Sequence, residues 1–326
     1  MTILFLHVGL HKTGTSAIQM ALSQNTQWLH EHGYLYPPPD SVDAHHTVVS
    51  GLLQSATDPS LGKTEFLRQL KEWWNSAERS GVNILISSEM FSEGIDFDFM
   101  RTLSAQYPMR VIIYLRRQDL LAESAYNQIL KQTGVVIADI VSTPPYHLNL
   151  LGVLSRWSSI VGEQNLIVRL YGIDKSKENW LVEDFLNALG IGDQAGFSLV
   201  KDTINESLGL IEFRLLEEIA PYLGKDFIPL VKYLRSRIRN VAGNNDIPMV
   251  GNYLTVSQRQ AIMNSVNDGN ERIRKQFFPE REQLFPPISN DVEHRIISYS
   301  WAKLIAHECL EGSLIRDVVD DNIILK

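Results

Sequence analysis

The sequence predicts an α/β fold in which a P-loop-type parallel sheet is flanked by helices and followed by a mostly helical C-terminal part. Over about the first 190 residues, short apolar runs alternate with segments whose apolar residues recur at helical spacing. This alternation is typical of a parallel sheet with crossover helices. The first apolar run ends in a loop with two glycines that opens a helical segment, and beyond about residue 200 the pattern is mostly helical.

The N-terminal segment is predicted as strand, loop and helix. Residues 3–8 are a short apolar run that ends at Gly9. Apolar residues at helical spacing over residues 15–32 predict one helix, with Gly33 as its C-terminal cap. Residues 34–36 are expected to form a short second strand.

Three prolines at residues 37–39 follow this strand and force an extended loop that contains His45 and His46. The loop is long enough to reach a site. After it, apolar runs predict three more strands, at residues 82–87, 109–115 and 166–170. Helical periodicity predicts further helices at residues 64–80, 97–106, 118–132, 147–161 and 178–189.

The length of 326 residues is compatible with one large catalytic domain. We predict a single domain over 1–326, with an α/β nucleotide-binding core at 1–195 and a helical part at 196–326. No linker rich in Pro, Gly or Ser separates the two parts, and no internal repeat is visible. The division near residue 196 is therefore one of secondary structure rather than of independent domains.

Composition narrows the class of protein. A formal net charge of −8 argues against a broad nucleic-acid surface, although a local basic pocket remains compatible with it. The single cysteine, Cys309, cannot form an intrachain disulfide or a cysteine zinc site, and it is expected to pack in a helix. The N-terminus has neither a basic leader nor an apolar run long enough to span a bilayer, which favours a cytoplasmic enzyme.

The loop from Gly9 to Ser16 has the spacing of an anion-binding loop. Two glycines stand five positions apart, as in a Walker A loop, and Thr15 and Ser16 follow at the start of the helix. The lysine, however, is Lys12, before the second glycine, and Thr15 occupies the place of the Walker lysine. Backbone N–H groups at the helix N-terminus still favour a phosphate or sulfate.

Two alternatives compete with this interpretation of the loop. An ordinary strand-to-helix turn with a Thr or Ser cap has the same features, so the loop alone is a weak signal. A kinase or ATPase is disfavoured because the Gly-Lys-Ser/Thr geometry that holds a γ-phosphate with magnesium is lost. The better Gly-Lys-Thr triplet, at residues 62–64, has no apolar strand before it, and we reject it as a P-loop.

A second anion-binding element follows the strand at residues 109–115. Arg116 stands at the end of this strand, and Ser124 lies eight residues later on the next predicted helix. Both positions can face the carboxyl edge of the sheet, where open parallel sheets bind ligands. A guanidinium binds phosphate through two parallel hydrogen bonds, so this pair can bind a second phosphate.

The segment 10–16, taken together with Arg116 and Ser124, resembles the sulfotransferase superfamily that uses 3′-phosphoadenosine 5′-phosphosulfate (PAPS). The short Lys-Thr-Gly-Thr-Ser loop is similar to that of bacterial and glycan-type members. The resemblance implies that the first loop binds the 5′-phosphosulfate and that Arg116 and Ser124 bind the 3′-phosphate. The residues that it assigns to the first loop are Lys12, Thr13, Gly14, Thr15 and Ser16, and His11 beside them is a further candidate for binding the cofactor.

The resemblance also has gaps. Arg117 is a less certain neighbour of the 3′-phosphate. A late Arg-Lys-Gly segment, which cytosolic members carry for the nucleotide, is absent. Lys232 and the arginines at 235, 237 and 239 are a candidate replacement, although such a run is more often a solvated helix face.

In-line sulfuryl transfer needs neutralisation of charge on the leaving oxygen and a base for the acceptor hydroxyl, but no metal. We assign the first task to Lys12. The candidate bases are Glu89, at the end of the strand 82–87, and the loop histidines His45 and His46. Each also has a structural alternative, a helix cap for the glutamate and solvent exposure for the histidines.

Other residues receive weaker assignments. His7 lies inside a predicted strand and is expected in the core, and His11 is expected either to contact the sulfonate or to shape the loop. Tryptophans on predicted helices are expected to pack in the core. We therefore predict a PAPS-dependent sulfotransferase acting on a small-molecule or glycan hydroxyl, with no nucleic-acid partner. A nucleoside-triphosphate kinase and a non-catalytic nucleotide-binding protein remain the alternatives.

Overall fold

The computed structural model describes residues 1–41, 43–144, 148–172, 179–199, 208–223, 227–244 and 253–288. The chain groups into two compact units, each assembled from separated stretches. The first unit comprises Met1–Arg117, Asn149–Ile204 and Asp268–Pro286. The second comprises Gln118–Leu148, Asn205–Asn267 and Pro287–Lys326. Each unit contains its own cluster of buried apolar side chains.

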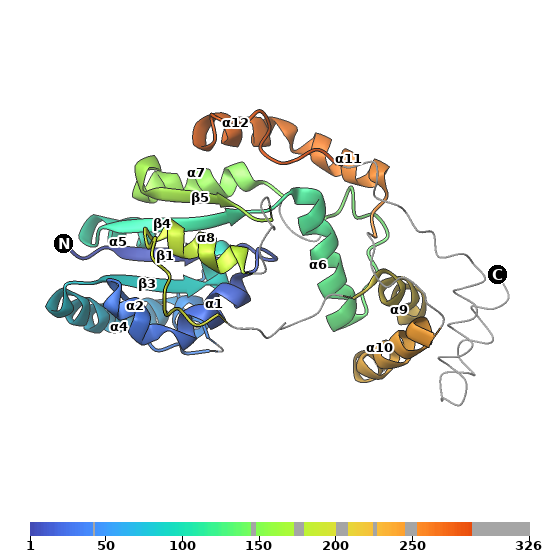
Figure 1. The fold of residues 1–326 in the computed structure, drawn as a ribbon, viewed down its shortest axis with the longest axis horizontal. Coiled ribbons are helices and arrows are strands. Elements are labelled where there is room, and N and C mark those ends of the chain that lie inside the picture. Colours follow the sequence, from blue (N-terminus) through green and yellow to red (C-terminus); the bar gives the residue numbers. More distant parts are fainter. Residues whose placement is uncertain are drawn as a thin grey trace. The chain divides into compact units, whose positions relative to one another are not determined.

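The first unit is built on a five-stranded parallel sheet with the strand order β2-β3-β1-β4-β5 (Figure 1). Its strands are β1 (Leu4–Val8), β2 (Tyr34–Leu35), β3 (Asn83–Ser88), β4 (Met109–Leu115) and β5 (Leu166–Leu170). All four neighbouring pairs are parallel, and Val8 pairs with Ser88 on one side and with Ile113 on the other. The predicted fold class is confirmed, and β1, β3 and β4 reach the same edge of the sheet.

Helices cover both faces of this sheet (Figure 1). One face packs on α1 (Thr15–Gln24), α2 (Thr26–Glu31) and α8 (Trp180–Ala188), with Phe5, Leu85 and Ile112 in the shared core. The remaining helices of this unit are α3 (His46–Ser50), α4 (Pro59–Ser80), α5 (Phe97–Gln106), α7 (Leu150–Val161) and nearly all of α12 (Asn267–Phe277). Its described residues also form two 3-10 turns, η1 (Glu89–Ser92) and η2 (Glu163–Asn165).

The single helix expected at residues 15–32 is wrong, because the chain breaks at Asn25. This residue has φ −119° and ψ 27°, outside the helical region, and separates α1 from α2. Its side-chain amide donates to the carbonyl of Ser198 (2.9 Å), and its side-chain oxygen accepts from the N–H of Ser198 (2.8 Å). A contact with a residue so distant in sequence leaves no periodic signal.

The expectation for Gly33 at the end of α2 is met in its backbone. Gly33 has φ +89°, as a C-terminal cap requires.

Two other expectations for this unit need correction. The loop after the prolines is not extended throughout, because α3 begins at His46, where Asp40 accepts from the N–H groups of Thr47 and Val48. Helix α4 begins at Pro59, five residues earlier than expected, because Asp58 caps it by accepting from Leu61 N–H at 3.0 Å. The rejected triplet at residues 62–64 therefore lies inside a helix.

The second unit is helical in its described part, and it combines the stretch 118–148 with residues of the predicted helical part 196–326. It contains α6 (Gln118–Thr133), α9 (Leu210–Leu223), α10 (Phe227–Asn244) and α11 (Val256–Ser265). Leu121, Tyr126, Phe213, Phe227 and Ile262 belong to its apolar core. The stretch 118–148 precedes β5 in the chain but belongs to this unit.

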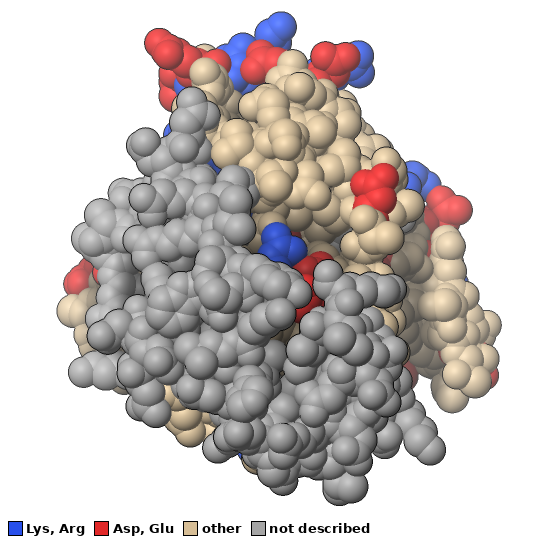
Figure 2. Space-filling view, turned by 90° about the vertical axis from the view of Figure 1, so that its right-hand side faces the viewer, with Lys and Arg blue, Asp and Glu red and all other residues tan. Residues whose placement is uncertain are grey.

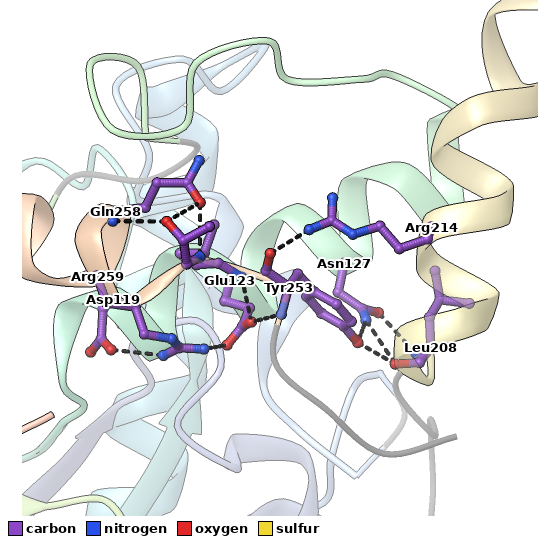
Figure 3. Close-up of polar contacts among 10 residues, drawn as sticks. Asp119, Glu123, Asn127, Leu208, Arg214, Tyr253, Gln258 and Arg259 are labelled. Atoms are coloured by element: carbon purple, nitrogen blue, oxygen red, sulfur yellow. Dashed lines mark hydrogen bonds and ion pairs between the residues drawn. The ribbon is translucent and has the colours of Figure 1, made fainter. Parts of the chain in front are cut away.

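A buried ion-pair cluster joins α6 to α11 in the second unit (Figure 3). The side chain of Arg259 is 1% exposed; it donates to Asp119 (2.7 Å) and to Glu123. Glu123 also accepts from the backbone N–H groups of Tyr253 and Leu254. One buried guanidinium is thus shared by two carboxylates, both oxygens of Glu123 are bonded, and Nε of Arg259 is buried without a hydrogen-bond partner.

The surface of the described residues shows no separation of charge on the face drawn in Figure 2. There, Lys and Arg side chains lie interspersed with Asp and Glu. Within the described ranges, no helix combines the length and the apolar character that crossing a membrane requires.

Candidate functional site

The loop between β1 and α1 contains two residues with left-handed φ angles, a feature of anion-binding nests. Lys12 (φ +64°) and Gly14 (φ +79°) are both left-handed, and Thr13 between them is not. Alternation of this kind turns successive N–H groups toward one concave side, where an anion can accept from them. Lys12 is one of only two non-glycine residues with positive φ in the described part of the chain.

Two hydroxyls of the loop bond within the loop, and a third is exposed. Thr13 and Thr15 are buried, and both donate to the carbonyl of Leu10, at 2.7 and 3.4 Å. Ser16 is exposed at the start of α1. The two threonine hydroxyls therefore shape the loop, and that of Ser16 is on the surface where a ligand can reach it.

The N-terminus of α1 adds further N–H groups beside the loop. Gly14 is the N-cap residue, and no side chain caps the helix. The first N–H groups of a helix have no acceptor within the helix, and the helix dipole adds a partial positive charge there. An oxyanion is the ligand that this geometry favours.

Both glycines of the loop are required by close packing. A Cβ at Gly9 would lie 2.5 Å from Thr15 Cγ2 and 3.1 Å from Glu89 Cγ. A Cβ at Gly14 would overlap Leu181 and approach Tyr171 to 3.0 Å. The loop, the start of η1 and the region after β5 are thus in contact at this edge of the sheet.

Arg116 supports the loop from the end of β4. Its Nη1 atom donates to the backbone carbonyl of Lys12 at 2.5 Å, and its guanidinium lies 5.2 Å from the centre of the Tyr171 ring. Arg117 donates instead to the carbonyl of Pro286. The sequence predicted Arg116 at this edge but gave no signal for its bond to the loop.

Glu89 lies beside the loop, at the carboxyl end of β3 where it was expected. Its Oε2 atom is 3.4 Å from Nδ1 of His11, and the side chains of both residues are 27% exposed. The other ring nitrogen of His11 pairs with Glu93. Glu93, which follows Glu89 by four residues and lies just after η1, was not predicted from the sequence.

These contacts set the ionisation of the site. Burial alone would raise the pKa of Glu89, but His11, His46 and the Thr15 hydroxyl outweigh burial and hold that pKa below its ordinary value. The Glu89 carboxylate raises the pKa of His11 against the effect of burial, and Glu93 adds to the rise. Glu89 is therefore an ionised carboxylate at neutral pH.

The two loop histidines have different environments. His46 is half-buried, and its Nδ1 atom lies 2.8 Å from the Ser88 hydroxyl, next to Glu89 in the chain. His45 is fully buried: Nδ1 accepts from the N–H of Ser87 (3.2 Å), and Nε2 donates to the carbonyl of Pro37 (3.0 Å). The structure thus brings His46, and not His45, within the electrostatic reach of Glu89.

His7 is a core residue, as expected. It is completely buried, and its Nδ1 atom lies 2.8 Å from the hydroxyl of Ser87, which also accepts from Gln19. Burial lowers the pKa of His7 to about 3, against the opposing charge of Glu89. The ring is neutral at neutral pH and packs against Phe185.

Several predicted residues lie in the second unit. Ser124 is half-buried on α6, whereas Arg116 belongs to the first unit, so their joint role remains a prediction. Arg235 and Arg239 on α10 both pair with the buried Glu212. The side chain of Arg237 and the whole of Cys309 lie outside the described residues.

The tryptophans on the predicted helices differ in burial. Trp157 is fully buried and packs against Phe91, as predicted for a core residue. Trp180 is half-buried, and the centre of its ring is 5.3 Å from the centre of the Tyr171 ring. The guanidinium of Arg116 lies over that Tyr171 ring. Trp301 lies outside the described residues.

Comparisons with known proteins leave the family open. No family model matches the chain. An uncharacterized protein from Archaeoglobus fulgidus is 26% identical over 225 residues, which cover 64% of this chain and 60% of that protein. The chain thus spans about 60% of the length of the curated relative it matches. The crystal structure of a sulfotransferase from Alicyclobacillus acidocaldarius aligns with 71% of this chain and 95% of that one, with a TM-score of 0.39 and 18% identity.

Proposed function

We propose that the protein is a PAPS-dependent sulfotransferase that acts on a hydroxyl acceptor. One observation carries the proposal: the loop that holds Lys12 forms an anion nest at the uncapped N-terminus of α1, and the ionised Glu89 lies against this loop. An anion cradle and a base at one edge of a parallel sheet are what in-line group transfer to a hydroxyl requires.

The residues of the loop fit a phosphosulfate better than a nucleoside triphosphate with magnesium. Thr15 occupies the place of the Walker lysine, and its buried hydroxyl donates to Leu10 within the loop. A lysine at that place would reach the β- and γ-phosphates. Lys12, by contrast, lies within the nest and is half-buried. The 5′-phosphosulfate of PAPS would be held by the loop N–H groups, Lys12 and Ser16.

When bound, PAPS supplies an activated sulfuryl group. Lys12 neutralises the charge that develops on the leaving phosphate oxygen, and the N–H groups of the nest orient the oxygens that do not react. Glu89 accepts the proton of the acceptor hydroxyl, so that an O–S bond forms to the acceptor while the O–S bond to the phosphate breaks. The acceptor is proposed to be a small molecule or a glycan.

Among the three candidate bases, the contacts favour Glu89. Its pKa is held low, so the carboxylate is available over the neutral range. His46 lies close enough to influence its charge and is the second candidate. His45 is disfavoured because both of its ring nitrogens are bonded to the backbone.

Titration calorimetry tests the cofactor. Adenosine 3′,5′-bisphosphate, the product left after transfer, should bind in the presence of EDTA, and much more tightly than ATP with or without magnesium. Lys71→Ala, which removes an exposed lysine on α4, is a matched control for loop variants. Tight, magnesium-dependent binding of ATP and no binding of the bisphosphate would contradict the proposal.

A further inference from the structure

Glu93 stands on a rigid piece of backbone next to the candidate site. Its N–H donates to the carbonyl of Met90 (3.1 Å), and its own carbonyl accepts from Ile95 (2.8 Å). The following residues are fixed to a neighbouring segment, since Gln54 N–H donates to Gly94 and Asp96 N–H donates to Leu52, both at 2.9 Å. The backbone of Glu93 is therefore held by a network of hydrogen bonds, and its side chain extends from this fixed point.

From this position Glu93 contacts the loop through His11. Its carboxylate pairs with Nε2 of His11, while Nδ1 of the same ring faces Glu89. Glu93 is the outer carboxylate, with its side chain 43% exposed against 27% for Glu89. A ring whose two nitrogens each face a carboxylate is stabilised as the doubly protonated imidazolium.

We propose that Glu93 is a positioning residue for the transfer reaction: it anchors the His11 ring from the solvent side, and His11 in turn fixes the Glu89 carboxylate against the loop. The inference rests on the proposed function, in which Glu89 is the base. Removing the charge of Glu93 leaves His11 with one carboxylate partner. The ring then loses its proton at lower pH and holds Glu89 less firmly.

Other titratable groups also face this cluster. His46 approaches Glu89 from α3, and His7 lies below it on β1. The pKa of His7 is about 3, so this residue does not titrate in the neutral range. Lys12 neighbours His11 in the loop. A pH profile of the whole enzyme sums the contributions of all its titratable groups, so an observation specific to His11 is needed.

NMR titration of the ligand-free protein gives that observation. The His11 signal, one of nine histidine signals, is assigned by its loss in His11→Gln. In Glu93→Gln the His11 signal should titrate at clearly lower pH than in the wild type. Glu65→Gln removes a carboxylate that pairs with Arg68 on the surface of α4, and it should leave the His11 titration unchanged. An unchanged His11 titration in Glu93→Gln would overturn the inference.

The pH dependence of transfer tests the consequence for Glu89. Relative to the wild type, turnover of Glu93→Gln should fall about tenfold at alkaline pH and little at acid pH, because His11 loses its proton at lower pH in the variant. A purely structural role would lower turnover by the same factor at both pH values, and that result would also overturn the inference. If the wild type transfers no sulfuryl group from PAPS, the proposed function fails, whereas the NMR titration still reports on Glu93 and His11.

Discussion

Arg116 at the end of β4 donates a hydrogen bond of 2.5 Å to the backbone carbonyl of Lys12, the residue that defines the loop. Lys12 has a left-handed backbone, which costs an ordinary residue about 1–2 kcal/mol. A charged donor on its carbonyl contributes free energy of similar size. The bond therefore ties the conformation of the loop to a second strand of the sheet.

Arg116→Ala should weaken the binding of adenosine 3′,5′-bisphosphate by about 10- to 100-fold, because a hydrogen bond from a charged group is worth about 1.5–3 kcal/mol. Both the predicted contact with the 3′-phosphate and the support of Lys12 are lost. Calorimetry measures the effect. Arg101→Ala, which removes an exposed arginine paired with Asp98 on α5, serves as the control and should bind like the wild type.

Lys12→Ala should lower turnover by at least about 10²- to 10³-fold, the usual loss for a group that stabilises charge in the transition state. Thermal stability should change little, since the backbone conformation is unfavourable for lysine and alanine alike. A transfer assay with a broad set of hydroxyl acceptors provides the measurement. A wild-type rate in this variant would remove the proposed role of Lys12.

Gly14→Ala should disrupt the loop more than its backbone conformation alone explains. Gly33 has a similar positive φ of +89° but has no atom within 4 Å of an added Cβ, whereas the Cβ at Gly14 overlaps Leu181. We expect Gly33→Ala to cost about 1–2 kcal/mol from strain alone. Gly14→Ala should cost more and should also weaken bisphosphate binding. Equal effects in chemical denaturation would show that the loop tolerates the side chain.

The His11 and Glu89 pair predicts how stability depends on pH. The folded-state pKa of Glu89 is depressed, so its contribution is present above the ordinary value of 4.5 and is lost as pH falls through the lower folded value. The folded-state pKa of His11 is raised, so its contribution is complete below 6.5 and is lost as pH rises through the higher folded value. Both contributions are complete only between the two ordinary pKa values, 4.5 and 6.5. The difference in Tm between the wild type and His11→Gln should therefore be largest in this pH range.

This pH dependence has a simple control. His30 is exposed on α2, and His30→Gln should leave the Tm close to that of the wild type at every pH. The difference in Tm between the wild type and His11→Gln could instead stay constant from acid to alkaline pH. That result would mean that His11→Gln loses stability through packing rather than through charge.

Arg259→Met should destabilise the second unit by about 3–5 kcal/mol, because Asp119 and Glu123 are left buried without their cation (Figure 3). Urea denaturation followed by circular dichroism measures the loss. Arg272→Met removes an exposed arginine on α12 and is expected to stay within about 0.5 kcal/mol of the wild type. A loss below about 1 kcal/mol for Arg259→Met would contradict the importance of this cluster.

Much of the fold followed from local patterns. The strand at 109–115, the helix at 97–106 and the strand at 166–170 were predicted with the bounds that the structure shows. Buried parallel strands are short apolar runs, and their crossover helices carry a 3.6-residue period, so both are visible in sequence. The break at Asn25 and the early start of α4 were missed, because one depends on a distant contact and the other on a capping side chain.

The candidate site, like the fold, was predicted from the sequence only in part. The sequence by itself predicted an anion-binding role for the loop with its displaced lysine, and it placed Glu89 and Arg116 at the carboxyl edge of the sheet, because strand ends and glycine spacing are local properties. Only the tertiary structure decided which side chains meet there: Glu93 through His11, Arg116 on the Lys12 carbonyl, and His46 rather than His45 near Glu89. Contacts between separate elements depend on packing and burial, which no periodicity in the chain records.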